Sequence, residues 1–154
     1  MSVRDPLTLR PLTNDDTDLL SEWYYEDRDG LEEVFGARMP TERAFIKKCN
    51  ELFQLMQRFS ARMLMADLRS ETIGFVLVTD VAQSLDMARA HIYLRPSKRR
   101  YALRIAEAGI TEATTMGIKT LVQTVKSDNA SAIKLSKRVG FLPSPTVILT
   151  KELR

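Results

Sequence analysis

The stretch Ala88–Met116 constrains the fold more than any other, because a strand, a sharp stop and a helix follow one another within it. Its first part alternates as a β-strand does and places His91 and Tyr93 on one face. Pro96 ends the strand, because proline has no N–H to donate and a fixed φ. From Tyr101 onward the apolar residues recur three and four positions apart, which predicts a helix with one buried face.

The basic turn between this strand and this helix, Lys98-Arg99-Arg100, predicts an anion-binding site. The N–H groups of a first helical turn have no partner within the helix, and the helix dipole favours negative charge there. The alternative is that the arginines only solvate the start of the helix. The local pattern does not decide between these two readings.

The chain as a whole is predicted to form a single domain of residues 1–154. This length can bury a substantial core, and the composition, 44% hydrophobic and 28% charged, is that of an ordinary globular protein. No apolar run is long enough to span a bilayer, and the start M-S-V-R-D-P lacks the apolar core of a signal peptide. These features predict a cytoplasmic protein that does not associate with membranes.

The charge is unevenly distributed along the chain. Residues 1–36 hold ten acidic and three basic residues, a local charge of −7, whereas the remaining residues carry +10. This division indicates an acidic surface cluster on an otherwise basic protein. We call this cluster the acidic lip; its residues are Glu26, Asp27, Asp29, Glu32 and Glu33. The uneven charge disfavours a nucleic-acid-binding protein. The acidic lip would attract a cationic amine, although such runs are more often a solvated loop.

The cysteine and histidine content excludes several kinds of site. With only Cys49 and His91, the chain can form neither an internal disulfide nor a His/Cys metal cluster, so we predict no metal site. Cys49 falls on an apolar helical stripe together with Phe45, Leu52, Phe53, Met56 and Phe59. That position predicts a buried structural thiol rather than a nucleophile.

The other predicted elements complete a mixed sheet covered by helices. Residues 26–40, with Gly30, Gly36 and Pro40, are interpreted as a mobile acidic connection. The remaining elements are a strand at Leu7–Leu12, a helix after Thr13 or Asn14 that turns Leu19, Leu20 and Trp23 inward, a helix from Thr41, a hairpin of Ala61–Leu68 and Thr72–Asp80, a strand at Thr120–Val125, a helix at Ala130–Arg138 and a last strand at Thr146–Thr150.

Three stretches, in this order, carry a family resemblance that covers nearly the whole chain. They are M-L-M-A-D-L-R-S-E-T-I-G-F-V-L-V from residue 63, H-I-Y-L-R-P-S-K-R-R-Y-A-L from residue 91 and N-A-S-A-I-K-L-S-K-R-V-G-F from residue 129. Together they resemble the GNAT superfamily of acetyl-CoA-dependent N-acetyltransferases. The last stretch is similar to that family's N-x-x-A-x-x-L-Y-x-x-x-G-F pattern.

The resemblance implies an α/β (α+β) fold with a mixed, mostly antiparallel sheet of six to seven strands flanked by four helices. It also implies a reaction, the transfer of an acetyl group from acetyl-CoA to the primary amine of a small molecule or a protein. Acetyl-CoA would lie between the fourth and fifth strands. A homodimer or an assembly partner would use the exposed edge near the last strand.

Site residues follow by matching positions to the family's motifs. His91 is the candidate base, because its unperturbed pKa lies near neutrality, and the other reading is an ordinary strand residue. Tyr93 would act as an acid or as a wall of the pocket, and a backbone N–H near Tyr93 or Leu94 would polarise the thioester carbonyl. The cofactor-binding candidates are Leu94, Arg99, Arg100, Tyr101, Ala102, Leu103 and Asn129, and Asn129 is equally a helix cap.

Two departures from the family pattern leave a second function open. Tyr101, Ala102 and Leu103 stand where the family's loop is rich in glycine, so charge rather than close backbone approach would hold a pyrophosphate. Ser136 stands where many members carry the tyrosine that protonates the leaving thiolate, and serine is a weaker acid. The alternative functions are an inactive GNAT-fold assembly or binding protein, of the kind a phage encodes, and a CoA-binding module without catalysis.

Overall fold

The structure is a computed structural model that describes residues 6–56, 62–79, 87–144 and 149–153. Two compact units divide the chain between Thr124 and Val125. The first unit contains the sheet with most of the helices, and the second contains one helix. Each unit is described by itself.

Five strands form one sheet in the order β1-β2-β3-β4-β5. The first four pair antiparallel and β5 runs parallel to β4, so the predicted mixed, mostly antiparallel sheet is confirmed. Among the described residues the sheet has five strands, whereas six to seven were predicted. The strands are β1 (Leu7–Pro11), β2 (Arg62–Leu68), β3 (Glu71–Thr79), β4 (Met87–Leu94) and β5 (Thr120–Val122).

Two strand predictions differ from the structure near the chain's C-terminal end. β5 ends at Val122 rather than Val125, because its ladder to β4 contains only three residue pairs. The predicted last strand falls mostly on residues 145–148, outside the described residues, and Leu149 and Thr150 belong to no strand.

Five α-helices occur among the described residues where four were predicted. The bounds are α1 (Thr17–Glu26), α2 (Arg28–Phe35), α3 (Glu42–Met56), α4 (Ala102–Thr115) and α5 (Ala130–Arg138). Two short 3-10 helices, η1 (Asn14–Asp16) and η2 (Pro96–Tyr101), precede α1 and α4. The basic turn after β4 is therefore itself helical, and α4 begins one residue later than predicted.

The additional helix, α2, shows that the prediction of a mobile connection at residues 26–40 is wrong. Asp27 caps α2 by accepting a hydrogen bond from the Gly30 N–H at 3.3 Å. Leu31 is fully buried, and Val34 and Phe35 pack against the same core. These apolar residues lie three and four positions apart, and their burial outweighs the acidic residues and the glycine between them.

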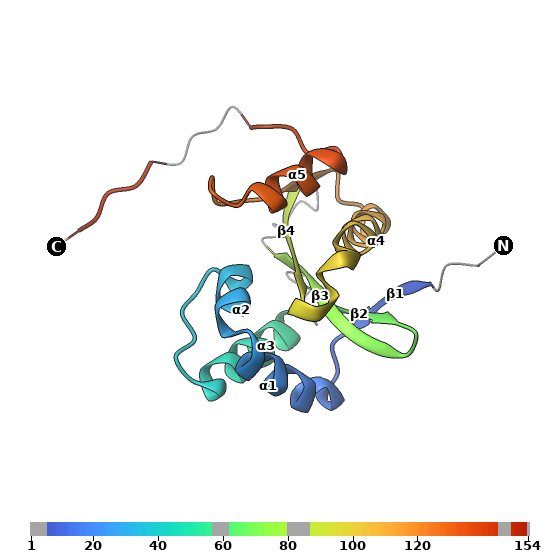
Figure 1. The fold of residues 1–154 in the computed structure, drawn as a ribbon, viewed down its shortest axis with the longest axis vertical. Coiled ribbons are helices and arrows are strands. Elements are labelled where there is room, and N and C mark those ends of the chain that lie inside the picture. Colours follow the sequence, from blue (N-terminus) through green and yellow to red (C-terminus); the bar gives the residue numbers. More distant parts are fainter. Residues whose placement is uncertain (1–5, 57–61, 80–86, 145–148, 154) are drawn as a thin grey trace. The chain divides into compact units, whose positions relative to one another are not determined.

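The sheet of the first unit separates two hydrophobic cores (Figure 1). Helices α1, α2 and α3 cover one face, and α4 covers the other. The first core, which contains the predicted Leu20, Trp23, Phe45 and Cys49, is built on Met63, Met65, Phe75, Leu77 and Tyr93 of the sheet. The second joins Leu64, Ala66, Ile73, Val76, Val78, Ala88 and Leu94 to Ile105 and Ala113 of α4.

Other predictions about this unit have definite outcomes. Cys49 is buried at 2% exposure, as predicted for a structural thiol, whereas the side chains of Leu52, Phe53, Met56 and Phe59 lie outside the described residues. The hairpin turn is confirmed at Arg69 and Ser70, whose positive φ angles of 53° and 63° suit a two-residue hairpin loop.

Gly74 marks a close approach between β3 and β4. A Cβ atom at this position would lie 2.0 Å from the Tyr93 carbonyl oxygen. The β2–β3 register shifts between Ala66 and Asp67, so β3 carries one extra residue beside Gly74. A bulge and a close backbone approach are therefore both present at Gly74, beside the end of β4.

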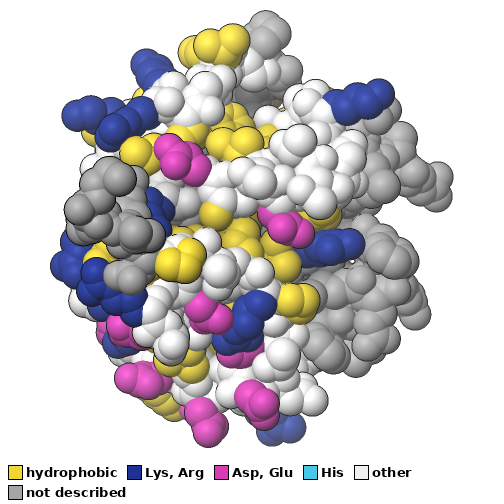
Figure 2. All heavy atoms as spheres, turned by 90° about the vertical axis from the view of Figure 1, so that its right-hand side faces the viewer, with side chains coloured by type: hydrophobic (Ala, Val, Ile, Leu, Met, Phe, Trp, Pro, Cys, Tyr) yellow, Lys and Arg dark blue, Asp and Glu magenta, His cyan; other side chains and the backbone are white. Residues whose placement is uncertain are grey.

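Acidic and basic side chains both lie on the face that Figure 2 draws, and Lys and Arg side chains occur in its upper and lower halves. Figure 2 shows Asp and Glu side chains mostly in the lower half of this face, on the side where Figure 1 places α1. Among the described helices, none combines the length and the apolar character needed to cross a bilayer.

Candidate active site

The C-terminal half of β4 carries the predicted strand residues His91, Tyr93 and Leu94. Tyr93 lies in the core under α1, and Leu94 lies in the core under α4, so the predicted alternation of faces is confirmed. His91 is two residues before Tyr93, pairs with Leu77 of β3 and is half-buried.

Tyr93 is held by aromatic packing and by one carboxylate. Its ring centroid lies 5.6 Å from that of Trp23 and 5.1 Å from that of Phe75. Its hydroxyl donates a hydrogen bond to Asp27 Oδ2 at 3.2 Å. Burial and the neighbouring Asp27 carboxylate raise the pKa of Tyr93 well above its usual value, so the hydroxyl keeps its proton at neutral pH.

Asp27 is a site residue whose role the sequence does not reveal. Its side chain is 15% exposed and accepts from three donors: the Gly30 N–H, the Tyr93 hydroxyl and Arg99 Nη2, the last at 3.2 Å. The capping role is detectable as an aspartate before a helical apolar pattern. The other two partners come from residues 66 and 72 positions away, which no local pattern contains.

The basic turn after β4 is paired with acidic residues from other elements. Arg95 Nη2 lies 3.0 Å from Glu26, and Lys98 Nζ lies 3.2 Å from Glu71. With Arg99 bound to Asp27, three of the turn's cations have a carboxylate partner. Part of the predicted acidic lip therefore neutralises the predicted anion site.

The remaining predicted residues of this turn lie at the start of α4. Arg100 lies 4.8 Å from the Tyr101 ring centroid and donates to the Tyr101 hydroxyl at 3.1 Å. This hydrogen bond lowers the pKa of Tyr101. The Ala102 N–H donates to the Arg99 carbonyl, and Leu103 follows in the first turn of α4.

The edge of β4 that faces β5 is paired with β5 only at the start of the strand. Only Met87, Ala88 and Arg89 pair with β5. Residues 90–94 have no ladder partner on that side among the strands that the structure describes. The Arg95 N–H donates to the Ile73 carbonyl, and antiparallel ladders alternate, so the Leu94 N–H points away from β3, toward the side of β5.

Two predicted residues belong to the second unit and are described within it. Asn129 caps α5 by accepting from the Ala132 N–H at 3.1 Å, which is its predicted capping role. The Ser136 hydroxyl donates to the Ala132 carbonyl at 2.8 Å, one helical turn earlier. The first unit thus brings Tyr93 and Arg99 together at Asp27, whereas Leu94 lies in the core on the other face of the sheet.

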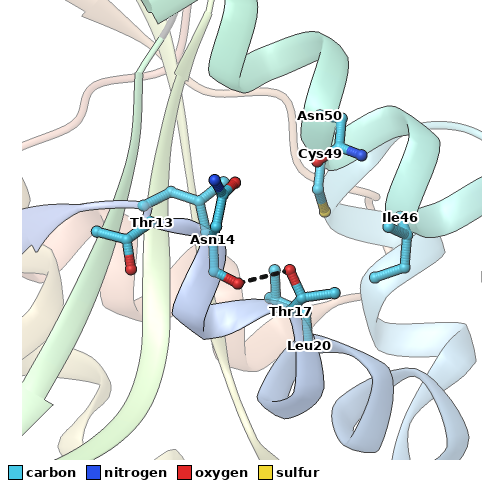
Figure 3. Close-up of a pocket in the computed structure, with 8 residues that line it drawn as sticks. Thr13, Asn14, Thr17, Leu20, Ile46, Cys49 and Asn50 are labelled. Carbon is cyan, nitrogen blue, oxygen red and sulfur yellow. Dashed lines mark hydrogen bonds between the residues drawn. The ribbon is translucent and has the colours of Figure 1, made fainter.

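A small cavity of about 10 Å³ lies away from this site, between η1, α1 and α3. Figure 3 shows Cys49 reaching from α3 toward Thr17 and Leu20 at this cavity. Burial raises the pKa of the Cys49 thiol to about 12. The thiol is therefore protonated at neutral pH and is not a nucleophile.

The comparisons with known proteins concern the family and the fold of the chain. The family model of the acetyltransferase (GNAT) domain matches residues 6–142. No curated protein sequence matches the chain.

Solved structures of similar fold include three acetyltransferases. RimL, a ribosomal L7/L12 alpha-N-protein acetyltransferase in complex with coenzyme A, has a TM-score of 0.76 at 17% identity, over 91% of this chain and 82% of that chain. Spermidine N-acetyltransferase from Vibrio cholerae, in complex with CoA and spermine, has 0.75 at 16% identity, over 90% and 82%. The aminoglycoside acetyltransferase AAC(6')-Ib in complex with coenzyme A has 0.72 at 20% identity, over 92% and 87%.

Proposed function

Because the chain belongs to the GNAT acetyltransferase family, whose domain model covers residues 6–142, we propose that it transfers an acetyl group from acetyl-CoA to a primary amine. The observation that carries this proposal is that, among the described strands, β5 pairs with Met87, Ala88 and Arg89 of β4, while β4 continues beyond this ladder to Leu94, directly before the basic turn. A cytoplasmic location and a homodimer or assembly partner remain part of the proposal.

Acetyl-CoA would bind along this part of β4. The Leu94 N–H points toward the side of β5 and would donate to the thioester oxygen, stabilising the oxyanion that forms when the amine attacks. Arg99 and Arg100 would bind the pyrophosphate through their guanidinium groups. Tyr101, Ala102 and Leu103, in the turn and the first residues of α4, would complete the cofactor contacts of this unit. A cofactor contact by Asn129, in the second unit, stays a prediction.

The transfer requires that one proton leaves the amine and one reaches the sulfur. The neutral amine nitrogen bonds to the acetyl carbon, the C–S bond breaks, and the thiolate leaves. His91 would take the amine proton, directly or through water. Tyr93 would form the wall of the acceptor side, since its proton is held by Asp27, or it would protonate the thiolate. An acid role for Ser136, in the second unit, stays a prediction.

The acceptor would be a cationic amine in solution. The similar structures are of enzymes whose names specify a ribosomal protein, spermidine and aminoglycosides, and all of these carry amines. The exposed Asp29 and Glu33 of α2 remain available to attract such a cation, whereas Glu26 and Asp27 pair with arginines.

A non-catalytic binding role is the second candidate, as an assembly protein or a CoA-binding module. It is favoured by one observation, that Arg95, Lys98 and Arg99 of the proposed pyrophosphate turn already have carboxylate partners. A turn neutralised in this way attracts a diphosphate less strongly than a turn with unpaired basic side chains would.

Calorimetry with acetyl-CoA tests both candidates. We expect binding by the wild type and loss of detectable binding on combining Arg99→Glu with Arg100→Glu. Arg43→Glu with Lys47→Glu, the same charge reversal on exposed residues of α3, is the matched control and should bind as the wild type does. Because a glutamate at position 99 would face Asp27, the pair Arg99→Gln and Arg100→Gln is measured as well.

Turnover then separates the enzyme from the binding module. We expect the wild type to acetylate a polyamine or a peptide amine, and His91→Ala to lower kcat by about 10²- to 10⁴-fold, the usual contribution of a general base. Absence of acetyl-CoA binding at millimolar ligand would reject the enzyme and the CoA-binding module together. If the protein bound acetyl-CoA but acetylated no amine, the enzyme would be rejected and the CoA-binding module would be supported.

A further inference from the structure

We infer that Asp27 competes with the cofactor's pyrophosphate for Arg99, so that the Asp27–Arg99 ion pair opens when acetyl-CoA binds. The inference rests on the proposed function, and it deepens it by assigning a control of cofactor affinity to a residue outside the cofactor-binding turn. It starts from the contact between Asp27 Oδ2 and Arg99 Nη2 at 3.2 Å.

The two partners of this ion pair differ in how firmly they are held. The Asp27 side chain is 15% exposed, whereas that of Arg99 is 63% exposed. Asp27 also accepts from the Gly30 N–H and the Tyr93 hydroxyl. When the ion pair opens, Asp27 therefore stays in place with two donors, and the Arg99 side chain moves.

The turn that carries Arg99 is anchored independently of this ion pair. The Arg95 side chain is 20% exposed and lies 3.0 Å from Glu26 and 3.6 Å from Glu71. Lys98 reaches Glu71 from the other end of the turn. Releasing Arg99 therefore leaves the backbone of η2 where it is, so the cost of opening is that of one partly exposed ion pair.

Competition rather than cooperation follows from the charges. A diphosphate bound to Arg99 would bring negative charge close to the Asp27 carboxylate, and like charges repel across a partly buried site. Arg99 thus gains the phosphate only by giving up the carboxylate. The ion pair lowers the affinity for the cofactor and holds Arg99 in one position while the site is empty.

Calorimetric titration with coenzyme A, which carries the pyrophosphate and cannot react, tests this competition. We expect Asp27→Asn to bind coenzyme A about two- to fivefold more tightly than the wild type, the upper range for loss of one partly exposed ion pair. Asparagine also serves as a helix N-cap, so the variant should fold, and its thermal unfolding is recorded alongside.

Two further variants exclude a general charge effect. Glu22→Gln removes the same charge from an exposed position on α1 and should leave the affinity within twofold of the wild type. In an Arg99→Gln background, Asp27→Asn should likewise change the affinity by less than twofold, because the residue it competes for is gone.

The outcomes separate this inference from the proposed function. Equal or weaker binding by Asp27→Asn, with binding by the wild type intact, would overturn the inference and show that Asp27 positions Arg99 for the phosphate. Absence of binding by both proteins would reject the proposed function and the inference with it. Binding gained only in Asp27→Asn would support the inference strongly.

Discussion

Arg10 shows how one residue joins three elements of the first unit, since it connects β1 to η1 and to β2. Arg10 of β1 contacts both carboxylate oxygens of Asp16, at 2.7 and 2.9 Å, and its Nε binds Asp67 of β2 at 2.7 Å. Burial alone would raise the pKa of Asp16, but the hydrogen bonds from Arg10 and the Thr13 N–H hold it below its usual value. Asp16 is therefore ionised in the folded protein at neutral pH.

The first prediction concerns the pH dependence that this arrangement creates. We expect Asp16→Asn to lower the free energy of unfolding at pH 7 by about 2 kcal/mol, because a buried charge-assisted pair is lost. Since the folded-state pKa is depressed, the contribution is present above the unfolded pKa of about 4 and is lost as pH falls through the folded value.

Urea unfolding of the wild type and Asp16→Asn at pH 7 and pH 3 measures this contribution. The difference in free energy of unfolding between the wild type and Asp16→Asn should be smaller at pH 3 than at pH 7. Asp18→Asn, which changes an exposed carboxylate on α1, is the matched control and should differ little from the wild type at either pH. A difference that stays constant with pH would contradict the assignment.

Residues whose roles are local were predictable from the sequence. Cys49 was predicted to be buried from its apolar helical stripe, and Asn129 was predicted to be a cap from its place before a helix; both are found so. Asp27 was not predicted to bind Tyr93 and Arg99, because these contacts depend on how α1, α2 and β4 pack in three dimensions. Its role was visible only in the assembled structure.

At the scale of elements, Gly74 determines how closely β3 approaches β4. A Cβ at Gly74 would lie 2.0 Å from a backbone oxygen, and a backbone atom cannot move aside alone. We expect Gly74→Ala to lower the free energy of unfolding by about 3 kcal/mol, the upper range for overpacking. It should also weaken acetyl-CoA binding, because β4 shifts at Tyr93 and Leu94.

Gly36→Ala is the control for this second prediction. Gly36 has a φ of +63° with nothing within 4 Å of an added Cβ, so the change costs only the backbone strain of about 1 kcal/mol. Thermal unfolding and calorimetry on both variants provide the comparison. If Gly74→Ala and Gly36→Ala lowered stability and acetyl-CoA binding equally, the close approach at Tyr93 would not determine either property.

The elements that the sequence predicted well have strong periodic patterns. The faces of β4 and the bounds of α5 follow directly from alternation and from helical spacing. The turn at Lys98–Arg100 was read as a loop before a helix, but proline at its start favours a helical turn, and η2 forms. α2 was missed because a glycine and a run of acids concealed three apolar residues at helical spacing.

At the scale of the molecule, one sheet shared by two cores should make the first unit unfold as a whole. The single tryptophan, Trp23, reports on the core under α1, whereas Ile105 of α4 is fully buried in the other core. We expect Ile105→Ala to cost about 3 kcal/mol and to lower the Tm seen by Trp23 fluorescence by roughly 6–12 °C.

The measurement for this third prediction compares two probes on the same protein. The Tm from tryptophan fluorescence and the Tm from far-UV circular dichroism should fall together in Ile105→Ala. Phe45→Ala, in the core that contains Trp23, is the matched variant. If the Tm from fluorescence and the Tm from circular dichroism differed in Ile105→Ala but agreed in Phe45→Ala, the two faces of the sheet would unfold independently.

The ion pairs of the basic turn also have a consequence for the nascent chain during synthesis. Glu26 and Arg95, and likewise Asp27 and Arg99, are 69 and 72 positions apart. At ordinary translation speeds the two arginines leave the ribosome roughly 4–14 s after the acids that they will bind. During that interval the emerged residues 1–94 hold sixteen acidic and eleven basic residues, a net charge of −5, and this excess makes neighbouring nascent copies repel one another.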